Sequence, residues 1–460
     1  MPINKDKLAY SLLLFFMFSF ILIVLKGLVT AQPGDENVYY YMGKLISEGK
    51  VPYRDFFFAH PPLHIYLIAL IYKIFGFNIV ILKSTPLIST LVSAFFVFKI
   101  TKEKFGNIGA LLSSLLFLFS YSVMFNSVFS FGINITAMLL VIGVYFLFNR
   151  GNYILAGIFF GLAGITRLLS LIPISVIFAL ILSSNKKNFL KLSSVFLMVF
   201  LLFNGLFILL LGNDYLTQVY KYHLLKSPGS KENLKEYADI IKLNWILFSS
   251  AILVVFVKDK KPLSVFIIIS IDYLISLMAL KKIFGFYFLI MLPFLAIIGG
   301  CSIVRIFKRL DLPKKSVVPI SIILALIFGW NLVSDTLFLE KIGFAGFERG
   351  KDLVDFIDSV SSKETLLFGD DSVVPLLALI TDKKIAFDFV DTNNQVFITR
   401  VRDLKKALND LKDKDVLFII RSNQGISYFT EVRVFLNRNC SLLSQFHDKL
   451  EGDYLAYRCK

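Results

Sequence analysis

Charged residues are scarce in this sequence. Asp, Glu, Lys and Arg together make up 18% of its 460 residues, whereas hydrophobic residues make up 56% and Phe alone occupies 49 positions. The mean hydropathy of +0.72 reflects this composition. A chain this apolar is not a soluble protein, so we expect it to be embedded in a lipid bilayer.

Internal repeats and low-complexity linkers are also absent from the sequence. Transporters and flippases are typically built from inverted repeats and place polar residues at the middle of the membrane. Neither feature is found here, which argues against a non-enzymatic transporter or flippase. A non-catalytic scaffold stays possible on these grounds.

The basic residues that give the net charge of +16 fall largely in short clusters between apolar runs. In a soluble chain this excess would indicate nucleic acid, but here the spacing is typical of membrane topology, and we expect no nucleic-acid partner. The clusters are Lys5 and Lys7; Lys99, Lys102 and Lys104; Arg150; Lys186, Lys187 and Lys191; Lys258, Lys260 and Lys261; and Arg305, Lys308, Arg309, Lys314 and Lys315.

Apolar runs of bilayer length predict an all-α membrane protein with about eleven transmembrane helices. The first run is long for a signal-peptide core and is followed by a poor cleavage site, so we expect it to remain as an anchor. The predicted spans are residues 8–29, 79–100, 108–125, 133–148, 153–166, 168–182, 189–211, 244–257, 263–280, 284–304 and 317–338.

Alternate connections are basic if the N-terminus lies in the cytoplasm, which predicts a multi-pass protein of the plasma membrane. Residues 31–78, residues 212–243 and everything after about Leu339 are then outside. Residues 62–77 are apolar but short, and they follow Pro61 and Pro62. Counting them as a span would invert every later loop, so we expect a helix lying at the membrane interface.

The composition becomes charged and mixed after Leu339. We therefore expect a membrane domain at residues 1–339, with residues 31–78 as its first external loop, and an extracytoplasmic α/β domain with a parallel sheet at residues 340–460. Its predicted strands are "ETLLFG", "KIAFDF" and "DVLFII", and its predicted helices are residues 350–360 and 399–411. In "FGDDS", Asp370 or Asp371 either meets a ligand at a strand end or caps a helix at Ser372.

Only three cysteines occur, and two of them, Cys440 and Cys459, lie on the expected oxidising side of the membrane. The runs "CSLLSQF" and "DYLAYRC" are strand-like and are joined by a segment that can turn at Gly452. An antiparallel hairpin that pairs Leu442 with Tyr457 and Ser444 with Leu455 sets the two cysteines opposite each other. We therefore predict a disulfide between them.

The first external loop contains an ordered set of motifs. Asp35 and Glu36 follow the first span, "GKVPYRD" ends at Asp55, and "PPL" opens the apolar stretch after His60. This set resembles the first loop of membrane glycosyltransferases of the GT-C class, in particular the family 39-like branch of protein O-mannosyltransferases, aminoarabinose transferases and RgtA/B/C/D-like enzymes. The resemblance covers roughly the membrane part of the chain.

The resemblance implies transfer of one sugar from a polyprenyl phosphate, dolichyl or undecaprenyl, to a lipid, glycan or protein acceptor on the outer face. An acceptor hydroxyl needs a base at neutral pH, and Asp35 is the candidate catalytic residue. Attack opposite the phosphate inverts the anomeric centre. The phosphate leaves without a general acid but needs cations.

Candidate cations and polar partners are found in the same expected outer loops. Arg167, Lys281 and Lys282 depart from the positive-inside pattern, which indicates either a partner or a lysine that snorkels to the interface. In the family a basic residue, Tyr and Leu-Pro follow each other in this region, which here suggests Tyr287. The candidate substrate-binding residues are Glu36, Tyr40, Asp55, His60, Arg167, Lys221, His223, Lys226, Lys281, Lys282 and Tyr287.

Alternatives stay open at several of these positions. Asp35 could be only a helix N-cap, and Asp55 only a turn residue. His60 and His223 could bind a divalent ion with Glu36 or Asp55, but without short ligand spacing we expect hydrogen bonding instead and no cofactor. Where many relatives have a second acid, this chain has Asn134.

An oligosaccharide transferase or glycan ligase is the second candidate within the enzyme class. Its sequon-reading Trp-Trp-Asp signature is absent, since Trp245 and Trp330 are far apart. We therefore favour transfer of a single sugar.

Overall fold

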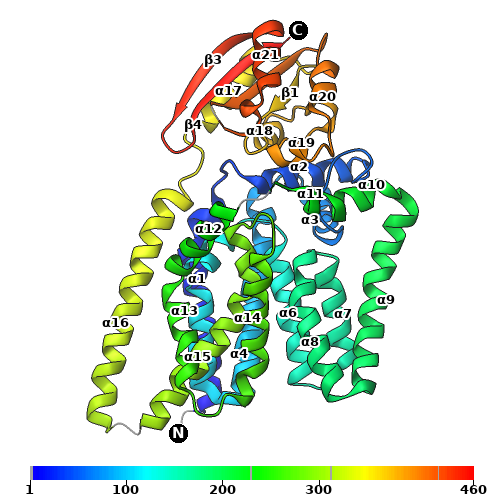
Figure 1. Ribbon diagram of the computed structural model, residues 1–460. Helices are drawn as coiled ribbons and strands as arrows, with labels where there is room; N and C mark the ends of the chain where they lie inside the picture. Colours follow the sequence, from blue (N-terminus) through cyan, green and yellow to red (C-terminus); the bar gives the residue numbers. More distant parts are fainter. Residues whose placement is uncertain (1–3, 228–229, 311–312, 423, 460) are drawn as a thin grey trace. The chain divides into compact units, whose positions relative to one another are not determined.

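A computed structural model describes residues 4–227, 230–310, 313–422 and 424–459 (Figure 1). The chain divides into two compact units, each assembled from separate stretches of sequence. Unit 1 comprises residues 1–28, 83–205 and 229–343, and unit 2 comprises residues 29–82, 206–228 and 344–460. The first loop, a short middle stretch and the C-terminal segment therefore belong to one compact body.

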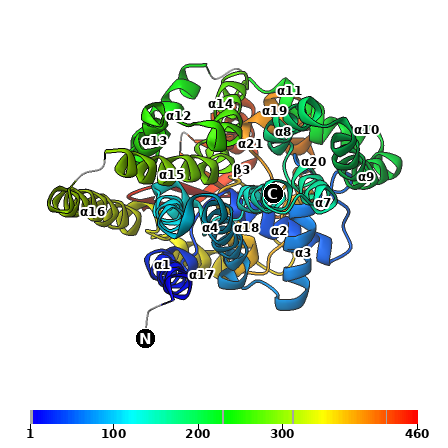
Figure 2. The same ribbon diagram turned by 90° about the horizontal axis from the view of Figure 1, so that it is seen from below.

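Unit 1 is helical, and Figure 2 shows many of its helices nearly end-on. Helix α1 packs against both halves of α4 through Ala9, Leu13, Phe98 and Ala110. The helices of unit 1, including three that continue into unit 2, are α1 (Lys5–Val29), α4 (Ile79–Leu118), α5 (Tyr121–Asn126), α6 (Ile133–Phe148), α7 (Tyr153–Gly164), α8 (Leu171–Ser184), α9 (Lys186–Leu211), α12 (Ser230–Leu243), α13 (Trp245–Ile252), α14 (Ser264–Met278), α15 (Leu292–Leu310) and α16 (Lys314–Phe338).

Helices cover every apolar run that the sequence predicts as a span, although several bounds differ. The runs at residues 79–100 and 108–125 form a single element, α4, which breaks at Gly106 (φ 79°), and α5 follows separately. Residues 244–257 form the short helix α13 and a 3-10 turn at Leu253–Phe256.

Five described helices are long and apolar enough to cross a membrane, or six if the bent pair at Glu232–Leu243 and Trp245–Phe256 is one span. The chain is therefore a multi-pass membrane protein. The count of about eleven spans and the orientation stay predictions, as does the interfacial position of α3 (Leu63–Phe75).

Small residues allow the helices of unit 1 to approach closely. A Cβ added to Gly300 of α15 would lie 2.4 Å from Oγ of Ser113 on α4, and one added to Gly161 of α7 would lie 2.7 Å from Cβ of Val199 on α9. In a bilayer, where apolar burial does not drive association, such close contact is what holds helices together. The glycine-lined surfaces are thus packing surfaces.

Unit 2 contains a four-stranded sheet in the order β1-β2-β4-β3 (Figure 1). Its core includes Phe368, Phe418 and Phe435. Its helices and strands are α2 (Asp35–Ser47), α3, α10 (Asn213–Leu216), the π-helix η2 (Thr217–Lys221), α11 (Tyr222–Leu225), α17 (Gly350–Val360), β1 (Leu366–Gly369), α18 (Val374–Ile380), the 3-10 turn η7 (Ala386–Asp388), α19 (Asn394–Ile398), α20 (Leu404–Asp410), β2 (Val416–Arg421), α21 (Thr430–Asn439), β3 (Cys440–Asp448) and β4 (Gly452–Cys459).

The prediction of a parallel sheet is wrong. Strands β1 and β2 are parallel, but β4 pairs antiparallel with both β2 and β3. The sheet is mixed because the C-terminal hairpin adds its second strand to the free edge of β2. The predicted division at Leu339 stays a prediction, since compactness does not decide which residues lie outside the membrane.

The predicted strand "KIAFDF" is also wrong. Only Ile385 forms a bridge, a parallel one with Leu367, and the chain then enters the 3-10 turn η7. Phe387 and Asp388 have φ values of 51° and 55°, in the left-handed region that an extended strand cannot contain. The predicted helix at residues 399–411 begins later, at Leu404, where the Asp403 side chain caps it.

The predicted C-terminal hairpin is present, and Cys440 and Cys459 form a disulfide. Leu442 pairs with Tyr457 as expected, but Ser444 pairs with Ala456 and not with Leu455. A register shift between Leu442 and Ser444 accounts for the difference, because an irregularity offsets every later pair by one residue.

Replacing Cys440 by Ser should destabilise unit 2 by about 3 kcal/mol, because the disulfide closes a loop of about twenty residues in the unfolded chain. Thermal unfolding of the detergent-extracted protein with and without reductant measures this. Cys301→Ser is the matched control, because Cys301 is a free, buried cysteine of unit 1. If reductant leaves the unfolding of the wild type unchanged, the disulfide does not form in the protein.

Candidate active site

The acidic pair of the first loop lies at the start of α2. Gly34 occupies the N-cap position and makes no side-chain cap, so Asp35 and Glu36 are the first two helical residues. The alternative that Asp35 is the N-cap is therefore wrong. Asp35 is exposed, whereas Glu36 is 1% exposed. The positive end of the helix dipole stabilises both negative charges at this position.

The Glu36 side chain folds back over Gly34. A Cβ added to Gly34 would lie 2.4 Å from Oε2 of Glu36, so any other residue here would require this carboxylate to move. The next residue, Asn37, donates from Nδ2 to the carbonyls of Gln32 (2.9 Å) and Gly34 (3.1 Å). These contacts fix the backbone that carries Asp35.

Helix α2 is fastened to the C-terminal segment of unit 2. The Lys44 ammonium lies 2.5 Å from Asp382, and the Tyr41 hydroxyl accepts the N–H of Ile385 at 2.9 Å. At the start of the helix, the N–H of Gly34 donates to the Ser372 carbonyl at 2.9 Å. The residue directly before Asp35 is thus hydrogen-bonded to the segment "FGDDS".

The motif "GKVPYRD" forms a tight turn. The Asp55 carboxylate accepts the Val51 N–H at 2.7 Å and pairs with Arg54 at 2.9 Å. The hydrogen bond and charge of Arg54 lower the pKa of Asp55. Gly49 and Tyr53 have positive φ (93° and 72°), as the turn requires. These contacts match the turn alternative for Asp55, and its contact with substrate stays a prediction.

A residue that the sequence did not single out, Gln218, ties this turn to the middle stretch of unit 2. Its side chain is 6% exposed. Its Oε1 accepts the Phe58 N–H at 2.9 Å, and its Nε2 donates to the Tyr53 carbonyl at 2.6 Å. One buried amide therefore satisfies two buried backbone groups of the first loop.

The two predicted histidines of unit 2 lie together. The rings of His60 and His223 stack with centroids 5.5 Å apart, and Nε2 of His223 is 2.7 Å from the Ala59 carbonyl. Tyr39 lies one turn after Asp35 on α2, and the centroid of its ring is 6.4 Å from that of His60. Of the described residues, no group of three or more His, Cys, Asp or Glu could hold a metal ion.

Lys226 and Lys221 have different surroundings. Lys226 is 9% exposed, lies over the Tyr222 ring at 4.9 Å and attracts the Asp391 carboxylate. Burial and the charge of Asp35 nevertheless raise the pKa of Asp391 to about 6. Lys221 contacts Asn213 at 3.2 Å near the surface. Asp391 is thus a further acid near Asp35 that the sequence analysis missed.

Tyr40 has no exposed surface. Burial and the charge of Glu36 raise its pKa, and among the described residues its hydroxyl has no hydrogen-bond partner. A substrate could reach the Tyr40 hydroxyl only if the residues that cover it moved. Its role in substrate binding stays a prediction.

The predicted cations of unit 1 lie around a row of aromatic rings. Arg167, 3% exposed, donates to the Phe131 carbonyl, and the Phe131 ring stacks on Phe286 at 4.8 Å. Phe286 stacks on Phe284 at 5.5 Å, and Lys282 lies 5.6 Å from the centre of the Phe284 ring. The row therefore connects Arg167 to Lys282.

Tyr287 contacts the same row, and Lys281 lies at its end. The Tyr287 ring is 5.1 Å from Phe286, and its carbonyl accepts the Tyr273 hydroxyl at 2.9 Å. Lys281 is exposed, and Asn233 holds its backbone by donating to its carbonyl at 3.2 Å. Contacts through this row thus link Arg167, Lys282 and Tyr287, and their binding of substrate stays a prediction. Asn134 bonds to Thr90 at 3.0 Å.

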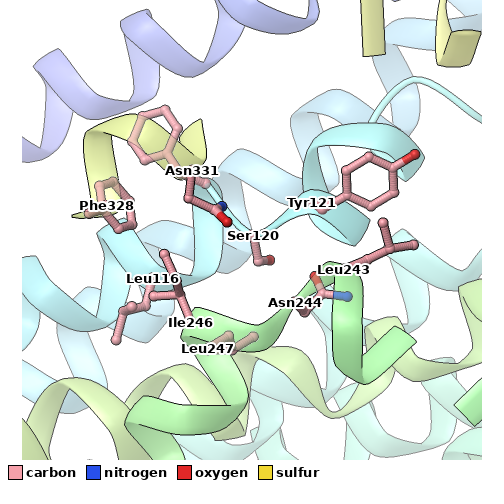
Figure 3. A pocket seen from close by; sticks show the side chains of 10 residues that line it. Leu116, Ser120, Tyr121, Leu243, Asn244, Ile246, Leu247, Phe328 and Asn331 are labelled. Carbon is pink, nitrogen blue, oxygen red and sulfur yellow. The ribbon is translucent and has the colours of Figure 1, made fainter. Parts of the chain in front are cut away.

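A small pocket in unit 1 contains none of the predicted residues. Figure 3 shows the side chains that line it, among them Ser120, Tyr121, Asn244 and Asn331. It has room for about one water molecule. It is therefore a packing defect beside a polar cluster and is too small for a sugar.

Among the comparisons with known proteins, a family profile covers the end of the first loop but neither Asp35 nor "GKVPYRD". The profile of the family described as dolichyl-phosphate-mannose-protein mannosyltransferase matches residues 59–209, about a third of the chain. A comparison with curated protein sequences finds no match. The matched part covers the end of the first loop and the helices as far as α9.

Solved structures match over nearly the whole chain. ArnT from Cupriavidus metallidurans bound to undecaprenyl phosphate aligns with a TM-score of 0.68 and 14% identity over 96% of this chain and 97% of that one. Its apo state gives a TM-score of 0.70 and 12% identity over 98% of both chains.

An oligosaccharyltransferase from Archaeoglobus fulgidus, in complex with Zn and sulfate, aligns with a TM-score of 0.58 and 12% identity over 96% of this chain and 72% of that one. The chain has the GT-C fold of these glycosyltransferases. The resemblance to the protein mannosyltransferase and ArnT type, predicted from the first loop, is confirmed.

Gln218→Leu should destabilise unit 2 by about 2–6 kcal/mol, since it leaves two buried backbone groups unpaired at about 1–3 kcal/mol each. Gln218→Glu is the matched control, because it keeps the acceptor for Phe58 and loses only the donor to Tyr53. Limited proteolysis of residues 49–60 reports the loss. Equal resistance of wild type and Gln218→Leu would show that the amide does not hold the turn.

Proposed function

We propose that this protein is a glycosyltransferase that moves one sugar from a polyprenyl-phosphate donor to a hydroxyl of a lipid, glycan or protein acceptor on the outer face of the plasma membrane. The observation that carries the proposal is the exposed carboxylate of Asp35 on a rigid helix start. ArnT, which has the same fold, is seen bound to undecaprenyl phosphate.

Asp35 serves as the general base. Its neighbours Gly34 and Asn37 are held by hydrogen bonds, so the carboxylate is presented from a fixed backbone. It takes the proton of the acceptor hydroxyl as the oxygen attacks the anomeric carbon. The bond to the carrier phosphate breaks on the opposite side, which inverts the anomeric centre.

The leaving phosphate needs positive charge and no proton donor. Lys281, Lys282 and Arg167 of unit 1 supply such charge, and the aromatic row of Phe131, Phe286 and Phe284 offers an apolar surface suited to a polyprenyl chain. Charged hydrogen bonds to phosphate are stronger than neutral ones. Tyr287 adds a hydroxyl beside this row.

Single-sugar transfer is preferred to oligosaccharide transfer. The chain covers 97–98% of the ArnT structures but 72% of the archaeal oligosaccharyltransferase, so that enzyme has a part with no counterpart here. Mass spectrometry of cellular glycans and glycolipids after deletion of the gene tests this. Loss of one sugar supports the proposal, and loss of a whole oligosaccharide contradicts it.

Asp35→Asn should lower turnover by about two to four orders of magnitude and leave folding intact, because an amide cannot take the acceptor proton. Turnover of the purified enzyme with lipid-linked donor measures the effect. Asp410→Asn, at another exposed carboxylate of unit 2, should be neutral. Glu36→Gln should reduce turnover less than Asp35→Asn. Near-normal transfer by the Asp35 variant would sink the assignment.

Lys281→Met and Lys282→Met should raise the apparent KM for the lipid donor by about 10-fold or more, since a charged hydrogen bond contributes about 1.5–3 kcal/mol. Arg167→Met should also raise the apparent KM for the lipid donor. Because the Arg167 side chain is buried, the folding of this variant is measured alongside its kinetics. Lys308→Met, in the last turn of α15, is the control. Unchanged kinetics in all three variants would leave the snorkelling alternative for the lysines.

A further inference from the structure

The turn at "FGDDS" separates two neighbouring acids with opposite surroundings. Asp370 is fully buried and fully engaged: one oxygen accepts the N–H and hydroxyl of Ser372, and the other pairs with Arg421 at 3.1 Å. Arg421 in turn pairs with Glu451 at 2.7 Å. Asp370 therefore has a sufficient structural role in the turn. It does not cap a helix as the alternative at Ser372 predicted, because α18 begins at Val374 and its N-cap residue, Val373, makes no side-chain cap.

Asp371 has no such role. It is 8% exposed, yet within the part of the chain that the structure describes no donor is hydrogen-bonded to its side chain and no cation is paired with it. Packing of the turn does not explain this acid, because Asp370 alone holds the turn.

Backbone contacts place Asp371 beside the first loop. The Ser372 carbonyl accepts the Gly34 N–H at 2.9 Å. Ser372 directly follows Asp371 in the sequence, and Gly34 directly precedes Asp35. The Thr392 hydroxyl donates to the Gly369 carbonyl at 2.5 Å and brings Asp391 to the same turn. Three acids from distant parts of the sequence thus meet in unit 2.

Resting on the function proposed above, we propose that Asp371 is a positioning residue for the transfer reaction, which acts through Asp35 by keeping a second carboxyl group beside the base. Asp391 is the third member of this group. The C-terminal segment thereby contributes directly to the chemistry of the first loop.

The charges around Asp371 support this role. Burial raises its pKa, and Asp370, Asp391 and Asp35 raise it further, while Arg421 lowers it. Lys226 acts on Asp391, and Glu36 lies next to Asp35 on α2. Repulsion between carboxylates is mutual, so the charges of Asp371 and Asp391, on which Asp35 acts, act on Asp35 in turn. A base that binds its proton more tightly removes one from a hydroxyl more readily.

The same surroundings make Asp371 costly for folding. Because folding raises its pKa above the ordinary 3.8, the folded protein holds this proton more tightly than the unfolded chain does. Its favourable contribution is complete below pH 3.8 and is lost as the pH rises through the raised value. An acid that served only the fold would have the opposite effect at neutral pH.

Asp371→Asn should therefore stabilise the protein while slowing the reaction. We expect the acidic limb of the pH profile of turnover to move to lower pH by about half a unit or more, because one charge of the group is gone. Turnover at the optimum should fall about 3–10-fold with little change in the acceptor KM. The apparent Tm at pH 7 should rise by about 2 °C.

Asp371→Glu should keep the wild-type acidic limb, and Asp410→Asn is the control for an acid of unit 2 outside the group, since Asp410 is an exposed carboxylate. An unchanged acidic limb in Asp371→Asn, or the same shift in Asp410→Asn, overturns the inference. A fall in Tm with loss of turnover also overturns it, because that is the behaviour of a structural residue. If Asp35→Asn keeps its activity, the proposed function fails instead.

Discussion

Hydrogen bonding of backbone groups in buried loops is the constraint on which this structure depends. Outside α2 and α3 the first loop has little regular structure, and its buried N–H and C=O groups there need partners away from water. They find them in distant stretches: Gly34 bonds to Ser372, Tyr53 and Phe58 bond to Gln218, and Ala59 bonds to His223. The position of Asp35 therefore depends on residues far from it in the sequence.

Much of the fold could be predicted because apolar runs and helix signals are local. The helices at Ile133–Phe148 and Gly350–Val360 begin and end as predicted, and the spacing of Cys440 and Cys459 in two strand-like runs was sufficient for the disulfide. The predicted strand "KIAFDF" was wrong because a long-range contact competes with local preference. The Tyr41 hydroxyl takes the Ile385 N–H, and the chain turns directly afterwards.

The candidate site was predictable where a motif carries it and not elsewhere. The ordered motifs around Asp35 and the cations that depart from the charge pattern of the loops can be recognised in a single sequence. Gln218 and Asp391 lie in no motif, and their roles follow only from what the folded chain brings near them. The motif "FGDDS" drew attention to two acids, but the sequence did not show that Ser372 and Arg421 engage Asp370 and leave Asp371 without such contacts.

Unit 2 is assembled from residues 29–82, 206–228 and 344–460. A ribosome reaches the last stretch only after adding more than 250 further residues, which takes about 15–50 s at about 5–20 residues per second. During this time the first loop lacks Ser372, Asp382 and Ile385, the partners that hold α2. Asp35 therefore reaches its final position only after the C-terminal segment has been made, so a partly made chain does not yet hold this carboxylate in place.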